Sequence, residues 1–336
     1  MKFGIFDHMD RGGGTLAAHY ADRLALIELY DRSGFYAYHV AEHHSTPLGM
    51  APSPSVFLAA AIQRTARLRL GPLVYTLSLY HPLRLIEEIC MLDQMSGGRF
   101  ELGIGRGISP IELGLYGVDP KQAQDIYEEV LAIVRIGLTS DRLTYEGRHF
   151  RFKDVPMELA PVQRPHPPIW LGSNNPKNSA DIARIGANVG HNLPPAQTRL
   201  CTDAYRAAWA ESGKPPAELP FMGFTRHIVI AETDDTALAI ARRAYLRWHQ
   251  SFYTLFRLYN FPPRLVYPDT FDEMLARGEA AAGTPATVLA QLRGQIEEGG
   301  VNYLFCRFAF GDITRSEATR SIELFAGEVM PSLKDL

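Results

Sequence analysis

Residues 93–109 read D-Q-M-S-G-G-R-F-E-L-G-I-G-R-G-I-S, and this stretch joins three kinds of local structure. It begins at the end of an apolar helix, which Gly97 and Gly98 stop because glycine readily takes left-handed backbone angles. A short buried strand is predicted next, over residues 100–104. Glycines alternate along the exit of this strand, with Arg106 between two of them. The stretch therefore predicts a helix, a turn and a strand that ends in a glycine-rich loop.

The loop after this strand has two interpretations. Glycines at the carboxyl end of a strand let the backbone approach a flat or phosphorylated ligand closely. An arginine held there, as Arg106 is, can pair with a phosphate or with the polar edge of a ring. The alternative is a glycine-rich turn with a solvated arginine. Unusual polar residues at the ends of several other predicted strands favour a ligand site.

The order strand, loop, helix repeats along the rest of the chain. Strands are predicted over residues 3–6, 36–40, 68–75, 100–104, 169–172, 187–190, 223–231 and 301–306. Eight strand–helix units predict an α/β fold of the (β/α)8 TIM-barrel type, and a single domain over residues 1–336. An open doubly wound sheet would need a dinucleotide-binding glycine fingerprint after the first strand, and residues 7–14 lack that spacing.

Two segments interrupt the repeat. Residues 144–156 alternate aromatic and charged side chains around Gly147, which predicts a small hairpin inserted at about residues 140–160. Residues 248–282 are rich in aromatic side chains and predict a second insertion. The second insertion has two open interpretations: a lid that supplies an apolar wall for a substrate, or a subunit contact that covers the rim of the barrel.

The composition excludes several classes of function. The apolar fraction of 46% and the charged fraction of 21% are typical of a soluble globular protein. A net charge of -3 gives no reason to expect nucleic acid or an anionic membrane as a partner. No apolar run approaches the roughly 18 residues that cross a bilayer. The three cysteines are widely spaced, which predicts a cytoplasmic protein with neither disulfides nor a zinc site.

Polar side chains follow several of the predicted strands, where the active site of such a barrel lies. Glu42, His43 and His44 follow the second strand. Their spacing matches no metal motif, so we predict no metal site. One neutral imidazole is instead suited to acid–base chemistry, because its pKa lies near working pH. The structural alternative is a histidine pair that packs under a loop. His227 on the seventh strand is predicted to be a packed residue, with a hydrogen bond to substrate as the alternative.

A second polar group follows the fifth strand and precedes a helix. It consists of Ser173, Asn174, Asn175 and Asn178. The free N–H groups and the positive dipole end of a helix suit a phosphate, especially beside short polar side chains. Capping the helix needs only one such residue. The size of the group therefore favours a phosphate site over simple capping.

At this point the chain resembles the bacterial luciferase-like family of flavin-dependent monooxygenases, and its layout is close to that of luciferase alpha subunits. The segments that carry the resemblance are M-K-F-G-I-F at 1–6, A-E-H-H at 41–44, H-P-L-R at 81–84, L-D-Q-M-S-G-G-R-F-E-L-G-I-G-R-G at 92–107, G-T-P at 283–285, F-G-D at 310–312 and L-F-A-G-E-V-M-P at 324–331. The resemblance extends over essentially the whole chain, and it implies the same (β/α)8 barrel as the strand pattern.

The resemblance implies a reaction and its participants. Reduced FMN, supplied by a separate flavin reductase, would react with O2 to give a flavin C4a-hydroperoxide. This species would oxidise a small or medium organic molecule such as an aldehyde, ketone or sulfonate. The family also implies a homodimer that forms through helices of the second and third units, where residues 59–61 are all alanine.

The resemblance also implies roles for individual residues. His43, His44 and Arg106 would be the catalytic residues, with the histidines acting as acid–base or peroxide-stabilising groups. The flavin ring would lie over a cis peptide between Leu73 and Val74 and against Arg106 and Gly107. The FMN phosphate would be bound by the following residues: Ser173, Asn174, Asn175 and Asn178.

The chain departs from this pattern at a few positions. Gly105 stands where luciferase has a reactive cysteine, and the second insertion is shorter than luciferase's mobile loop, so light emission is not implied. Thr225 stands where the alkanesulfonate branch has an arginine, which argues against a sulfonate. One alternative is an oxidoreductase that uses the deazaflavin F420, although that branch usually has E-H-D instead of E-H-H. The other is a non-catalytic flavin-binding protein, which would lose the histidines or Arg106.

Overall fold

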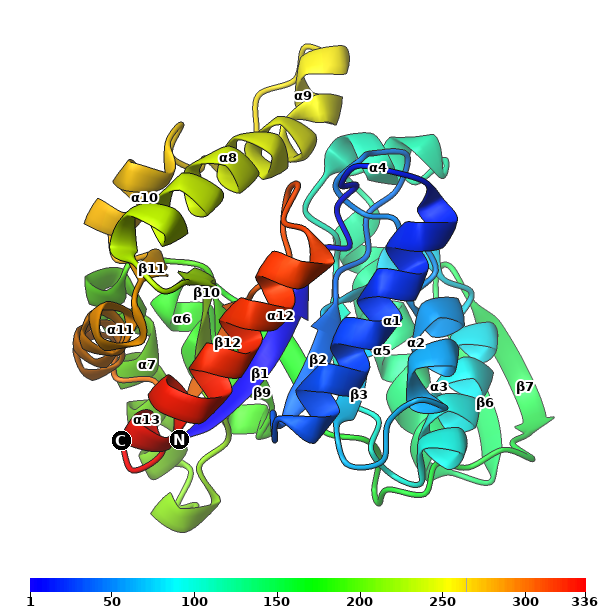
Figure 1. The fold of residues 1–336 in the computed structure, drawn as a ribbon. Coiled ribbons are helices and arrows are strands. Elements are labelled where there is room, and N and C mark those ends of the chain that lie inside the picture. The colour runs from blue at the N-terminus through cyan, green and yellow to red at the C-terminus, as the bar shows by residue number, and fades with distance from the viewer. Residues whose placement is uncertain (264) are drawn as a thin grey trace.

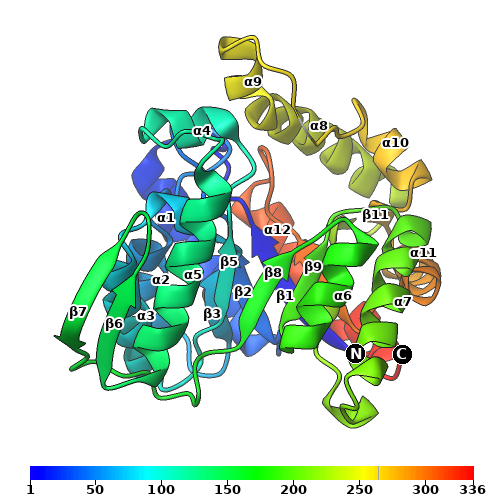
Figure 2. The same cartoon turned by 180° about the vertical axis from the view of Figure 1, so that it is seen from behind.

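The computed structural model describes residues 1–263 and 265–336. Its main sheet is entirely parallel and curls around a common axis, with helices on its outer side (Figures 1 and 2). The strands of this sheet are β1 (Lys2–Asp7), β2 (Ala37–Val40), β3 (Arg69–Pro72), β4 (Tyr75–Thr76), β5 (Leu102–Gly105), β8 (Ile169–Gly172), β9 (Asn188–His191), β10 (Met222–Ile230), β11 (Ala280–Gly283) and β12 (Tyr303–Arg307). All eight predicted strands are present.

The sheet closes through its third strand, which is divided into β3 and β4. The peptide bond between Leu73 and Val74, at the division, is cis. β3 pairs with β2, β4 pairs with β5, and Leu70 forms an isolated bridge to Phe100. The order around the barrel is therefore β1, β2, β3–β4, β5, β8, β9, β10 and β12, and β12 pairs with β1 again. This arrangement confirms the predicted (β/α)8 fold.

Helices cover the outside of the barrel and form short turns at its ends. The long helices are α1 (Leu16–Arg32), α2 (Pro54–Ile62), α3 (Pro82–Ser96), α5 (Ala123–Thr139), α6 (Pro176–Ile185), α7 (Pro195–Glu211), α8 (Asp234–Phe252), α11 (Pro285–Gly299) and α12 (Arg315–Leu324). The short ones are η1 (Leu77–Leu79), α4 (Pro110–Leu115), η2 (Pro216–Glu218), α9 (Thr254–Leu258), α10 (Phe271–Ala276), η3 (Phe325–Val329) and α13 (Met330–Leu333). Within the described ranges, none of the helices has the length and apolar character needed to cross a membrane.

The first interruption of the repeat is an antiparallel hairpin of β6 (Arg142–Glu146) and β7 (Arg151–Pro156), which lies outside the barrel (Figure 2). The second begins inside α8 and continues through α9 and α10 to β11; position 264 of this segment lies outside the described residues. β11, α11 and α4 were not predicted from the sequence. β11 reads A-A-A-G, which has little intrinsic strand preference, and it forms because β10 offers a buried edge beside it.

Large side chains from β12 fill the interior of the barrel. Tyr303, Phe305 and Arg307 alternate along this strand and therefore share one face. Gly223 on β10 leaves space for the Phe305 ring, because a Cβ at this glycine would lie 2.6 Å from a ring carbon. Trp170 from β8 packs against Tyr303 and Phe305 at centroid distances of 5.0 and 5.2 Å. Arg307 is thus the next side chain above this aromatic layer, at the carboxyl end of the barrel.

Candidate active site

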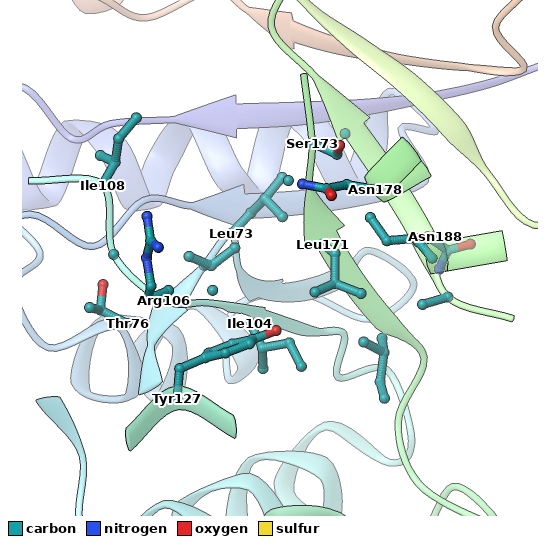
Figure 3. Close-up of a pocket in the computed structure, with 18 of the residues that line it drawn as sticks. Leu73, Thr76, Ile104, Arg106, Ile108, Tyr127, Leu171, Ser173, Asn178 and Asn188 are labelled. Carbon is teal, nitrogen blue, oxygen red and sulfur yellow. The ribbon is translucent and has the colours of Figure 1, made fainter. Parts of the chain in front are cut away.

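A cleft of about 1190 Å³ opens at the carboxyl ends of β3–β4, β5, β8 and β9, and it continues down the outer face of β8 between α5 and α6. Figure 3 shows Arg106 on one side of this cleft and Ser173 and Asn178 on the other, with Leu73 between them and Leu171 below Asn178. The cleft has polar groups at its edges and aliphatic side chains in its middle. This distribution suits a ligand with a flat apolar body and charged or polar ends.

His43 lines the cleft and forms a pair with Glu112, which α4 carries. The His43 Nδ1 and Glu112 Oε1 atoms lie 3.1 Å apart. Burial lowers the pKa of His43, but the Glu112 carboxylate outweighs burial and raises this pKa above its ordinary value. Because Glu112 accepts a hydrogen bond from the Nδ1–H group, Nε2 is the ring nitrogen of His43 that stays available to a ligand. The pair can therefore hold and move a proton at the cleft wall.

His44 has a different environment from its neighbour. Its Nε2 lies 2.9 Å from Glu42 Oε1, and its Nδ1 lies 2.9 Å from the Tyr116 hydroxyl. The second oxygen of Glu42 accepts hydrogen bonds from the Thr76 amide and the Tyr80 hydroxyl. Both ring nitrogens of His44 are thus engaged by protein groups. In the A-E-H-H motif, Glu42 and His44 fix the loop, and His43 faces the cleft.

Arg106 and Gly107 both line the cleft, and the Arg106 guanidinium is exposed and donates to Gln124 Oε1 at 3.3 Å. The glycines before Arg106 have a role that the sequence did not indicate. A Cβ at Gly103 would lie 2.0 Å from the Pro72 carbonyl oxygen, and one at Gly105 would lie 2.6 Å from a Val74 methyl group. These glycines therefore allow the third strand to pack against β5, and this packing sets the position of Arg106.

The four polar residues after β8 have different structural roles. Asn175 is the N-cap of α6 and accepts a hydrogen bond from the Asn178 amide at 3.2 Å. Asn174 exchanges hydrogen bonds with the backbone of Asn192, which joins the loops after β8 and β9. Ser173 and the Asn178 side chain line the cleft at the amino end of α6 (Figure 3). The helix end therefore presents polar donors to the cleft, and Asn175 is turned toward the helix itself.

Most of the predicted site residues meet in this one cleft. The described lining residues include His43, Leu73, Val74, Arg106, Gly107, Ser173, Asn174 and Asn178, whereas His44 and Asn175 are not among them. Glu112, which also lines the cleft, was not predicted from the sequence. Ser109 caps α4 by accepting from the Glu112 amide at 3.2 Å, and S-x-x-E is a recognisable helix-start pattern. This pattern could have predicted α4, but not the contact of the Glu112 carboxylate with His43.

The side chains and backbone groups of the cleft match the chemical groups of FMN. Arg106 and the amino end of α6 supply positive potential for a phosphate. Leu73 supplies an aliphatic surface between them, and Ile104 and Leu171 line the cleft below it (Figure 3). The residues present therefore fit a phosphorylated flavin.

Comparison with curated proteins identifies relatives along the full length of the chain. The family model for luciferase-like monooxygenases matches residues 1–303. Protein y4wF of Sinorhizobium fredii (strain NBRC 101917 / NGR234) is 45% identical over 98% of this chain and 96% of its own length. The oxygenase component of a flavin-dependent trigonelline monooxygenase of Acinetobacter baylyi is 25% identical over 100% of this chain and 96% of its own.

Solved structures show the same architecture. The monooxygenase RslO1 of Streptomyces bottropensis is 28% identical, with a TM-score of 0.89 over 99% of both chains. The oxygenating constituent of 3,6-diketocamphane monooxygenase of Pseudomonas putida, solved with FMN, gives a TM-score of 0.82 at 21% identity over 98% of both chains. A coenzyme F420-dependent tetrahydromethanopterin reductase of Methanopyrus kandleri gives 0.72 at 20% identity over 99% of both chains. With the family model matched over residues 1–303, the chain belongs to the luciferase-like monooxygenases.

Proposed function

We propose that this chain is the oxygenase component of a two-component FMN-dependent monooxygenase. A separate reductase would supply reduced FMN, and the chain would oxidise a small or medium organic molecule with O2. The observation that carries the proposal is the meeting of Arg106, the amino end of α6 and His43 in one cleft. The named relatives that are flavin-dependent monooxygenases, and the FMN in one structural neighbour, support this choice of cofactor.

The cofactor site is proposed from the two ends of the cleft. Ser173, Asn178 and the N–H groups at the start of α6 would bind the phosphate. Arg106 would contact the polar edge of the ring, and the cis segment at Leu73 and Val74 would lie beneath it. Reduced flavin, when bound, activates O2 and delivers one oxygen atom to the substrate.

His43 is proposed as the group that holds a proton next to the reacting atoms. Its Nδ1 is bound to Glu112, so the ring orientation is fixed and Nε2 can donate or accept a proton in the cleft. The raised pKa keeps a larger fraction of His43 protonated near neutral pH. We propose that His44 and Glu42 position this loop without touching the substrate.

The second insertion supplies apolar side chains next to His43. A small space beside His43 and Glu112 is lined by Leu48, Phe252, Leu255 and Phe256. Three of these come from the segment that begins in α8 and continues into α9. Apolar residues at this place exclude water from the reacting centre, which favours oxygen transfer over loss of the oxidant to solvent. This arrangement supports the interpretation of the insertion as a lid.

The proposal is tested by anaerobic titration of the purified protein with reduced FMN and, separately, with reduced F420. We expect reduced FMN to bind at least tenfold more tightly. Mixing the FMN complex with oxygenated buffer should then give flavin reoxidation slower than that of free reduced FMN, and His43→Ala should remove this delay. Binding of F420 without uptake of FMN would contradict the proposal. The same holds for a wild-type complex that reoxidises as fast as free flavin.

We also propose that the chain forms a homodimer through α2 and α3. These helices expose large apolar side chains, with Val56 72%, Met91 50% and Met95 43% accessible. Ala60, one helical turn after Val56 on α2, is also exposed and would allow a partner helix to approach closely, whereas Ala61 is buried. Sedimentation equilibrium of the same sample should give twice the mass of the chain, and a monomeric mass would contradict this part of the proposal.

A further inference from the structure

Arg307 lies at the mouth of the barrel, across from the proposed cofactor site. It is the last residue of β12, and it pairs in register with His227 of β10. Tyr303 and Phe305 of the same face fill the barrel interior, so Arg307 continues this inward-facing row at its carboxyl end. In the order around the barrel, β12 lies opposite β5, which leads into Arg106. The mouth therefore has one arginine on each of two opposite sides.

The two arginines differ in their surroundings. Arg106 is exposed, whereas Arg307 is only 4% accessible. The Arg307 guanidinium lies 4.7 Å from the Phe6 ring centroid and 5.8 Å from that of Trp248, and the Tyr267 hydroxyl is its polar neighbour. Its Nε has no hydrogen-bond partner, and no carboxylate forms an ion pair with it, within residues 1–263 and 265–336. This is a buried cation without a counter-ion from the described chain.

Within the described residues, the other buried arginines, Arg23 and Arg226, differ in whether they have a counter-ion. The buried Arg23 pairs with Asp7 at 3.4 Å, and the half-buried Arg69 pairs with Glu101. Arg226, on the strand next to Arg307, faces α11, where it donates to Gln295 Oε1 at 2.8 Å; among the described residues its Nη2 has no partner and no carboxylate pairs with it. A buried charge without a partner is unfavourable, so such a group is retained where a ligand supplies the missing charge. Arg307 shares the missing counter-ion with Arg226, but Arg226 faces α11 whereas Arg307 lies at the barrel mouth beside residues of the cleft, and this position marks Arg307 as a binding group.

The groups around Arg307 do not cancel its charge. His8 and His227 are buried, and burial followed by the nearby Arg307 charge lowers the pKa of each well below its ordinary value, so both are neutral. Trp248 Nε1 donates to His8 Nδ1 at 3.3 Å. Two acids act on Arg307 from a longer distance: Asp10, which accepts from the Gly311 amide and lies 3.9 Å from Arg23, and Glu279, which pairs with Arg277 at 2.6 Å. The cluster thus has a net positive charge.

This cluster adjoins the cleft. Phe6, which packs on Arg307, lines the cleft, and the His8 and His43 rings are 5.6 Å apart. Asn192 also lines the cleft and donates to the Tyr267 hydroxyl, which in turn contacts Arg307. Arg307 itself does not line the cleft, so a polar group beside His43 reaches Arg307 only when Phe6 or the Asn192–Tyr267 pair moves aside.

We propose that Arg307 binds an anionic oxygen of the organic substrate, such as a carboxylate or phenolate, while the apolar part of the substrate contacts the lid. The apolar part would lie on Leu48, Phe252, Leu255 and Phe256, beside His43. The substrate would thus be an amphiphilic organic anion held between the cofactor and the α8–α9 segment. This inference rests on the proposed function, because it assigns the substrate class of the same site.

The test is isothermal titration calorimetry of the full chain with two probes of equal shape, 4-phenylbutyrate and 4-phenylbutanamide. We expect the wild type to bind the carboxylate at least about tenfold more tightly than the amide. Arg307→Met and Arg307→Gln should abolish this preference, and Arg307→Lys should retain part of it. Arg226→Met is the matched control: it removes an equally buried arginine of the adjacent strand and should keep the preference.

Reduced-FMN titrations of the same samples separate this inference from the proposed function. Arg106→Met should weaken FMN binding and leave the carboxylate preference unchanged. Arg307→Met should leave FMN binding unchanged and abolish the carboxylate preference. The inference is overturned if the folded wild type has no carboxylate preference, if the preference survives in Arg307→Met or Arg307→Gln, or if these variants lose FMN affinity as Arg106→Met does. Failure of the wild type to bind FMN would instead contradict the proposed function, and the probe titration would remain readable.

Discussion

The two sides of the barrel mouth are built in different ways. On the side proposed for the cofactor, formed by β3–β4, β5 and β8, the backbone positions the site: close-packed glycines, a cis peptide and the amino end of α6 hold Arg106, Ser173 and Asn178 in the cleft. On the side of β12 and β10, buried side chains provide it, with Arg307 and His227 among aromatic rings. A site whose shape is set by the backbone suits a ligand of constant shape, such as a cofactor. A site made of side chains can change its ligand without changing the barrel.

Gly103→Ala gives the largest effect expected from this comparison, because it tests whether the cofactor side depends on the backbone. The new Cβ would lie 2.0 Å from the Pro72 carbonyl oxygen, and neither strand can move without opening the barrel. We expect a loss of about 3 kcal/mol or more in the free energy of unfolding, measured with urea. Gly114→Ala is the control, since its Cβ has no described atom within 4 Å, and it should leave stability unchanged or slightly raised.

Asn178 and Asn175 separate ligand binding from helix capping on the same side. Asn178→Ala should weaken reduced FMN binding about tenfold with little change in stability, since its side chain faces the cleft (Figure 3). Asn175→Ala should lower the free energy of unfolding by about 1 kcal/mol, because it removes the N-cap of α6. Fluorescence titration and urea unfolding measure the two quantities. The reverse pattern would show that Asn175 binds FMN and Asn178 does not, which would contradict the assignment of Asn178 as the binding side chain.

Glu112→Gln gives the smallest effect and tests the pair that lies between the two sides. Without the carboxylate, burial dominates, so the pKa of His43 should fall below its ordinary value of 6.5. The raised pKa in the wild type stabilises the folded state fully below about pH 6.5, and this contribution is lost as pH rises through the folded pKa.

The wild type should therefore exceed Glu112→Gln in free energy of unfolding by about 1 kcal/mol near pH 6, and the difference should shrink toward pH 9. NMR titration of the histidine side chains gives the pKa directly, and urea unfolding across the pH range gives the energy difference. A His43 pKa that is equal in both proteins would mean that Glu112 does not control this proton.

The sequence allowed much of the cofactor side to be predicted. The strands, the loop at Arg106 and Gly107, and the helix start after Ser173 are all local patterns of apolar period, glycine and capping residues. The role of each residue within these patterns could not be predicted from the sequence. Asn174 and Asn175 match the phosphate-binding pattern as well as Asn178 does, but the structure uses them for a loop contact and a helix cap. Local sequence cannot rank residues that share a donor chemistry.

By itself the sequence determined the family, the eightfold strand repeat and the position of the candidate cofactor residues, because each of these depends on neighbours in the chain. Which side chains contact one another across the site was set by the tertiary structure. Glu112 meets His43 across 69 positions, and the Arg307 cluster draws side chains from β1, β10, α8 and β12 together with Tyr267. Closure of the barrel creates these contacts, since it places the carboxyl ends of eight strands around one mouth regardless of their separation in sequence.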